Sequence, residues 1–275
     1  FLKILLTLWL TANLTLVFVP LTGRDTLTFH LPAITDMIRA GRITFSPEVA
    51  GFYEWSPLFG EVLYASAAVI YQDFSAPFAF QVIQYSAIVL LLMLAHDFFR
   101  SRFTNKIFLA FLPILILSIF EIQREVMHGG YVDMLLLLFG IGALFPVLEL
   151  WDKRIEWDNK KIYLSAFLMG GALGVKYNAF YFLAITLALL VGAFWRRRKS
   201  AAEAARPLAG AFLIILCVAG FWYAKNALAF GNPIYPMIGI DGSRVISDTL
   251  IYERTLKNFL LFPYNQFGSL SERDS

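Results

Sequence analysis

Long runs of apolar residues constrain the fold of this chain more than any other feature of its sequence. A helix that crosses a lipid bilayer needs roughly 20 mostly apolar residues. Six runs reach or approach that length, near 2–20, 77–97, 104–121, 132–150, 160–195 and 207–223. Hydrophobic residues make up 59% of the chain and charged residues only 16%, so lipid is the solvent for most of it. The sequence therefore predicts an all-α fold, a polytopic bundle of transmembrane helices.

Two apolar segments need separate interpretation. The run at 160–195 is too long for one crossing and contains Lys176, which is costly at mid-bilayer. We therefore expect two helices there, with a break at 170–176, and about seven spans in all. The segment 57–71 is apolar but short, and it contains Glu61, so it fits an interfacial or re-entrant helix better than a span.

Basic residues predict the orientation of the bundle. If 57–71 does not cross, three basic loops fall on one side together with Lys3; they lie at 100–106, 153–161 and 196–206. An excess of lysine and arginine marks the cytoplasmic side. The outer face then holds the first extracytoplasmic loop at 21–72, the segment 121–131, the turn at Lys176 and the chain after Trp222.

The chain reads as one domain. No tandem repeat or flexible linker is visible, so we interpret 1–275 as a single transmembrane module. It begins within an apolar run, without a methionine, and ends on a polar run. We therefore expect it to be truncated at both ends.

The first outer loop contains two candidate catalytic carboxylates. Asp25 follows the first span directly, which places it at the membrane surface, and Glu54 lies in a polar and aromatic stretch. A short amphipathic, juxtamembrane helix is expected from Leu31, with Ile34 and Ile38 on its apolar face. A carboxylate at the lipid boundary is partly desolvated and can serve as a general base. The alternative for Asp25 is that it caps a helix beginning near 28.

Two further charged residues lie at predicted outer ends of spans. Asp133 opens the run at 132–150, where it either faces a cavity or complements the helix dipole. Lys176 either extends to the headgroups or binds a phosphate as a point charge. Arg124 and Lys225 are weaker candidates for phosphate binding.

Several kinds of site have no sequence signal. His30 and His128 on the outer face lack the spacing of a zinc site, so we predict no structural metal and no cofactor. The sequence does not indicate a divalent cation and leaves that requirement open. The single cysteine, Cys217, excludes an intramolecular disulfide. No phosphate-cradling glycine loop or dinucleotide fingerprint is present, which argues against soluble-nucleotide chemistry. The net charge of +3 is explained by cytoplasmic basic loops, so no nucleic acid partner is expected.

Taken in order, the outer-face motifs resemble those of the GT-C superfamily of polytopic glycosyltransferases. The resemblance is to bacterial protein-mannosyltransferase-like members of the glycosyltransferase family 39 type, and to lipopolysaccharide-core transferase-like members. The motifs that carry it are Asp25 followed by Phe29-His30-x-Pro32, then Asp133, then Lys176-Tyr177, then Gly231-Asn232-Pro233-Ile234-Tyr235-Pro236. They extend over nearly the whole chain.

The resemblance implies a catalytic module that takes a sugar from a polyprenyl-phosphate donor. The acceptor would be a lipid, glycan or protein outside the cytoplasm, at the periplasmic face of a bacterial inner membrane. It implies that Asp25 activates the acceptor, that Asp133 is a second acidic residue and that Lys176 binds the carrier phosphate. Glu54 matches as a further catalytic candidate, and the implied substrate-binding residues besides Lys176 are His30, Tyr177 and Arg124.

Other functions remain open at the level of sequence. A transporter or flippase of a lipid-linked or small polar substrate would also carry charges within a helical bundle, although polar residues near mid-bilayer and paired broken helices would be expected. An acyltransferase would use a histidine beside an acid, which His128 and Asp133 permit. A purely structural bundle would leave the long acidic and aromatic first outer loop without a role.

Overall fold

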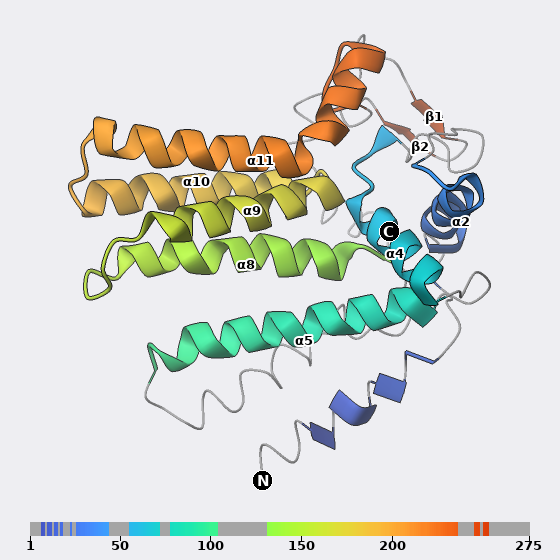
Figure 1. The fold of residues 1–275 in the computed structure, drawn as a ribbon, viewed down its shortest axis with the longest axis horizontal. Coiled ribbons are helices and arrows are strands. Elements are labelled where there is room, and N and C mark those ends of the chain that lie inside the picture. Colours follow the sequence, from blue (N-terminus) through green and yellow to red (C-terminus); the bar gives the residue numbers. More distant parts are fainter. Residues whose placement is uncertain are drawn as a thin grey trace, which may run out of the picture. The chain divides into compact units, whose positions relative to one another are not determined.

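The computed structural model is an assembly of helices (Figure 1). It describes residues 7–8, 10–12, 14–15, 17–18, 23, 26–43, 55–71, 78–103, 131–235, 245–247 and 250–252. Its helices are η1 (Thr26–His30), α2 (Leu31–Ala40), α4 (Phe59–Tyr71), α5 (Phe78–Arg100), α8 (Asp133–Trp151), α9 (Asn159–Val175), α10 (Ala179–Arg196) and α11 (Ala201–Phe230). Apart from one short strand pair, the described part of the chain confirms the all-α prediction.

The chain divides into two compact units, 1–220 and 221–275. The strand pair belongs to the second unit, where β1 (Val245–Ser247) runs antiparallel to β2 (Leu250–Tyr252). In the same unit the Asn226 side chain donates a hydrogen bond to the Tyr235 carbonyl over 2.6 Å. This bond ties the end of α11 to the predicted Gly-Asn-Pro motif.

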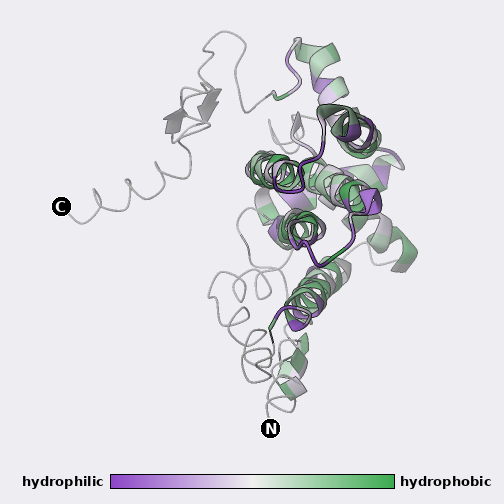
Figure 2. Ribbon diagram, turned by 90° about the vertical axis from the view of Figure 1, so that its left-hand side faces the viewer, coloured by the Kyte–Doolittle hydropathy of each residue, from purple (hydrophilic) through white to green (hydrophobic). Residues whose placement is uncertain are grey.

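Among the described residues, four helices are long and apolar enough to cross a membrane: α5 from Phe80, α8, α10 and α11. They confirm the predicted spans near 77–97 and 132–150, the second half of 160–195, and 207–223. Figure 2 shows apolar residues along the helices and hydrophilic residues in the segments that connect them. The predicted span at 104–121 lies outside the described residues, as does most of 2–20, so the total of seven stays a prediction.

The long run at 160–195 does divide into two helices, but the break is shorter than predicted. Helix α9 continues to Val175, and Lys176 has extended backbone, with φ −160° and ψ 146°. The predicted break at 170–174 is wrong because its glycines serve helix packing. A Cβ atom on Gly170 would lie 2.8 Å from Val218 Cβ, and one on Gly171 would lie 3.1 Å from the Phe139 ring. Small residues let neighbouring helices approach closely in a membrane.

The core of the first unit lies between α8, α9 and α10. Its central buried residues are Val147, Leu150, Ile162, Ala166, Leu190, Ala193, Phe194 and Ala211. Two hydrogen bonds link these helices: Ser165 donates to the Ala143 carbonyl over 2.7 Å, and the Trp151 indole donates to the Leu189 carbonyl over 2.8 Å. The bundle therefore holds the ends of α8, α9 and α10 in fixed relation.

Helices η1, α2 and α4 lie within 21–72, the segment that the sequence predicts to be the first extracytoplasmic loop. Helix α2 is amphipathic, as predicted, but it buries Ala33, Ile34 and Met37 instead of Leu31 and Ile38. The difference arises because α2 packs against η1 and α4. Helix α4 has 13 residues, a length of about 20 Å, which is short of the roughly 30 Å hydrocarbon layer. This length agrees with an interfacial or re-entrant helix.

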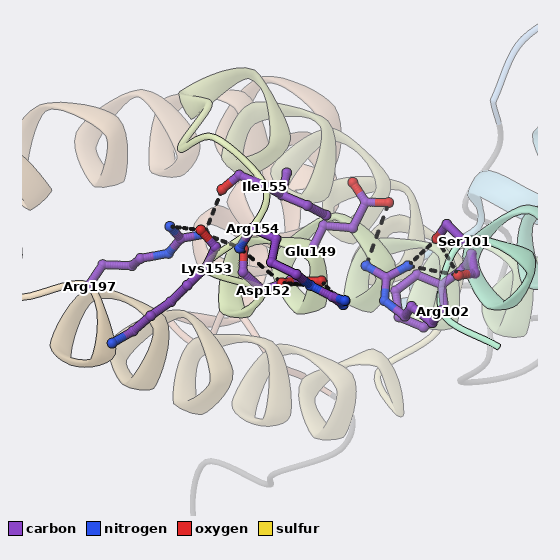
Figure 3. A network of polar contacts seen from close by, with 9 residues as sticks. Ser101, Arg102, Glu149, Asp152, Lys153, Arg154, Ile155 and Arg197 are labelled. Atoms are coloured by element: carbon purple, nitrogen blue, oxygen red, sulfur yellow. Dashed lines mark hydrogen bonds and ion pairs between the residues drawn. The ribbon is translucent and has the colours of Figure 1, made fainter. Parts of the chain in front are cut away.

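The three predicted basic loops meet at one end of the bundle (Figure 3). Arg197 donates hydrogen bonds to the carbonyl oxygens of Leu150 and Ile155, over 3.0 and 2.8 Å, and also reaches those of residues 152 and 153. Glu149 lies between Lys161 and Arg102, with oxygen–nitrogen distances of 2.5 and 3.9 Å. Arg197 therefore satisfies carbonyl groups that the end of α8 leaves without helical partners.

Replacing Arg197 with alanine should destabilise the protein by about 2–4 kcal/mol, because several carbonyl groups lose a charged donor together. The matched control is Arg154→Ala. Arg154 is exposed and, among the described residues, pairs with Asp152 in the same loop, so its loss should change stability little. Hydrogen bonding to Arg154 holds the pKa of Asp152 well below its ordinary range, so that pair stays intact through neutral pH. Equal unfolding midpoints for the two variants in detergent would refute the assigned role of Arg197.

Candidate active site

At the other end of α8, a lysine and an aspartate form an ion pair. Lys176 Nζ lies 2.8 Å from Asp133 Oδ1. Asp133 begins α8, and Lys176 lies in the turn between α9 and α10. The pair joins these elements because α8 and α9 pack side by side in antiparallel directions. Two residues that the sequence singled out separately are thus brought together.

Both side chains of the Lys176–Asp133 pair are partly exposed. The side chains of Lys176 and Asp133 are 39% and 31% exposed, so a ligand can reach both. Helix dipoles favour a carboxylate in the first turn of α8 and a cation at the end of α9. A half-exposed ion pair contributes little to stability, so it can be rearranged at small cost. The pair with Asp133 shows that Lys176 has a partner within the protein and does not serve only to extend to the lipid headgroups.

A second acid–base pair connects η1 to α4. His30 Nδ1 lies 2.6 Å from Glu61 Oε1, and the two side chains are 15% and 4% exposed. The second carboxylate oxygen of Glu61 is buried and has no hydrogen-bond partner within the described residues. Glu61 was predicted only as a charge that interrupts an apolar segment. A lone carboxylate in an apolar segment requires a partner. That requirement is the sequence signal by which Glu61 could have been identified as a site residue.

Tyr131, two residues before Asp133, connects the two pairs. Its ring lies edge-on to His30, with 6.3 Å between ring centroids. Its carbonyl accepts a hydrogen bond from the buried Tyr64 hydroxyl over 2.7 Å. A Cβ atom on Gly23 would lie 2.6 Å from Tyr131 Cε2. Gly23, two residues before Asp25 in sequence, is therefore packed against Tyr131.

Gly23→Ala should destabilise the protein by about 1–3 kcal/mol, because the added methyl group overlaps the Tyr131 ring and that ring also contacts His30. Gly142→Ala is the matched control, since a Cβ atom there would meet its nearest neighbour at an ordinary 3.6 Å. Thermal unfolding of the two variants in the same detergent checks the difference. Equal midpoints would show that Gly23 does not need its close contact.

Tyr177 follows Lys176 but does not share its exposure. The residue is only 3% exposed, and its hydroxyl lies 3.5 Å from the Trp55 carbonyl oxygen, at the limit of hydrogen bonding. Its contact with Trp55 links the turn at Lys176 to the segment 21–72, the predicted first extracytoplasmic loop.

Three predicted site residues, Asp25, Glu54 and Arg124, lie outside the described residues. The structure brings together the other four, namely His30, Asp133, Lys176 and Tyr177, at one end of the first unit. It adds Glu61, Tyr64 and Tyr131, which the sequence did not identify as site residues. In the part of the chain that the structure describes, no group of three or more histidine, cysteine or acidic side chains could hold a metal ion.

Apolar spanning helices with an ionic cluster at one end define a polytopic integral membrane protein. No protein-family model matches the chain, and no curated protein matches it. Among solved structures, it is similar to the crystal structure of ArnT from Cupriavidus metallidurans bound to undecaprenyl phosphate. The TM-score is 0.62 at 16% sequence identity, over 84% of this chain and 42% of that one. The chain thus spans about two fifths of the ArnT chain. The likeness shows that the two chains share a fold.

Proposed function

We propose that the protein transfers a sugar from a polyprenyl-phosphate donor to a lipid, glycan or protein acceptor. The observation that carries the proposal is the Lys176–Asp133 ion pair, which lies at one end of a bundle with the ArnT fold. That ArnT structure has undecaprenyl phosphate bound, a ligand whose phosphate suits a cationic partner. Lys176 is the exposed cation of the described site.

The proposed mechanism is a single displacement with inversion. Asp25 accepts the proton of the attacking hydroxyl, whose oxygen forms a bond to the anomeric carbon of the sugar. The bond from that carbon to the phosphate oxygen breaks, and Lys176 stabilises the negative charge that develops on the leaving polyprenyl phosphate. Asp133 holds Lys176 in place before the donor binds. Glu54, Arg124 and Tyr177 are proposed to complete the site.

The proposed site faces the periplasm of a bacterial inner membrane. The basic loops lie at the Trp151 end of α8 and the ion pair lies at its Asp133 end. These ends are separated by the 19-residue length of α8, about 28 Å, which is close to the thickness of a bilayer core. Because basic loops mark the cytoplasmic side, the ion pair belongs to the opposite face.

A vesicle assay with a panel of radiolabelled polyprenyl-phosphate sugars tests the function. A transferase moves the label into a product that is no longer attached to the polyprenyl phosphate. A transporter or flippase moves the intact donor between leaflets without breaking the glycosyl bond. Transfer from one donor supports the proposal, whereas movement of intact donor with no cleavage would replace it with the transport alternative.

A further inference from the structure

Glu61 is the most buried carboxylate of the described site, and the proposed mechanism does not use it. Its side chain is 4% exposed, and its contact with His30 Nδ1 satisfies only one of its two oxygens. Burying a carboxylate with an unsatisfied oxygen costs stability. An unsatisfied buried group in a native protein calls for an explanation, and a role in a site is one such explanation.

The contact between the two side chains has a chemical consequence for the imidazole. A neutral imidazole carries its hydrogen on one ring nitrogen and a lone pair on the other. When Glu61 is ionised, its oxygens only accept hydrogen bonds, so Nδ1 of His30 donates to it. In the neutral imidazole the other nitrogen, Nε2, is then an acceptor. No partner of Nε2 lies among the described residues.

We propose that Glu61 is a positioning residue, which holds His30 so that Nε2 accepts a hydrogen bond from a hydroxyl group of the bound substrate. The inference rests on the proposed function and extends it from the phosphate to the hydroxyl groups of the reactants. The location of His30 supports this proposal, because its ring lies edge-on to Tyr131, which is two residues from Asp133. The hydroxyl belongs either to the transferred sugar or to the acceptor.

Glu61→Gln tests the positioning role. A glutamine oxygen can still accept from Nδ1, so a purely structural hydrogen bond survives the change. The glutamine amide can also donate to Nδ1, which moves the imidazole hydrogen to Nε2 and removes the acceptor. We expect kcat/KM to fall by up to roughly 10-fold, with unchanged thermal stability, because the acceptor is lost only in molecules whose glutamine amide donates to Nδ1; the lower end of the range known for partners of metal-bound histidines serves as a guide. Glu203→Gln is the matched control, because Glu203 lies at the basic end and glutamine also serves its helix-capping role.

His30→Asn gives a second, independent test. The asparagine amide can replace Nδ1 as donor to Glu61, but it has no counterpart of Nε2. We expect a kinetic loss similar to that of Glu61→Gln, and little further loss in the double variant, because both changes remove the same acceptor.

The kinetic constants identify the source of the hydroxyl. A higher KM for the donor alone assigns the hydroxyl to the sugar, and a higher KM for the acceptor alone assigns it to the acceptor. Wild-type kinetics in both folded variants would overturn the role of Glu61 and leave sugar transfer standing. Absence of transfer by the wild-type protein would instead overturn the proposed function, and the inference with it.

Discussion

Replacing Lys176 with methionine should lower the rate constant for sugar transfer about 10²- to 10³-fold, the loss typical when one preorganised charge-stabilising group is removed. Methionine keeps much of the apolar stem but has no charge. The ammonium group of Lys176 is the cation of the described ion pair that a carrier phosphate can reach. The leaving polyprenyl phosphate would then develop its charge without that partner.

Lys199→Met is the matched control for this prediction. Lys199 also pairs with a carboxylate, Glu203, at 2.9 Å, and its side chain is 31% exposed, compared with 39% for Lys176. It lies at the basic end of the bundle, so its loss should leave transfer unchanged. Initial rates measured at saturating donor provide the comparison. Similar rates for both methionine variants would remove Lys176 from the mechanism.

Asp25→Asn should lower kcat about 10²- to 10⁴-fold, the range typical of a lost general base. Asparagine has the size of aspartate but cannot accept the proton of the attacking hydroxyl. The measurement is single-turnover transfer from the preferred donor, which isolates the chemical step from product release.

Asp36→Asn controls for a change of charge in the same outer loop. Asp36 lies in α2, which follows η1 in sequence, and it has no role in the proposed chemistry. It should retain wild-type turnover. Full activity of a folded Asp25→Asn protein would show that another carboxylate is the general base, and Glu54 would be the first to test.

The sequence predicted the spanning helices because a bilayer imposes a length and a composition on them. Helices α5, α8, α10 and α11 lie where their apolar runs indicated. The position of Lys176 between two helices also followed from the cost of a charge at mid-bilayer. The break itself was placed too early because glycine has two uses. Gly170 and Gly171 weaken a helix by propensity, but in this bundle they allow side chains of neighbouring helices to pack closely.

The pairing of side chains within the site was harder to predict. Asp133 and Lys176 were both candidates, yet their contact joins residues 43 positions apart in sequence and depends on how α8 and α9 pack. The contact between His30 and Glu61 spans 31 positions and follows no periodic pattern. From the sequence, Glu61 was interpreted only as a charge that interrupts an apolar segment. Only the packing of α4 beside α2 shows that its carboxylate meets a histidine.

The most direct test of the central claim is cleavage of a polyprenyl-phosphate sugar by purified protein in detergent micelles. Micelles have no two compartments, so transport produces no chemical change there. Given donor and acceptor, wild-type protein should release polyprenyl phosphate in an amount equal to the sugar transferred. Lys176→Met protein should do so far more slowly. An intact donor after incubation with folded wild-type protein, across the whole panel of sugars and acceptors, would contradict the central claim.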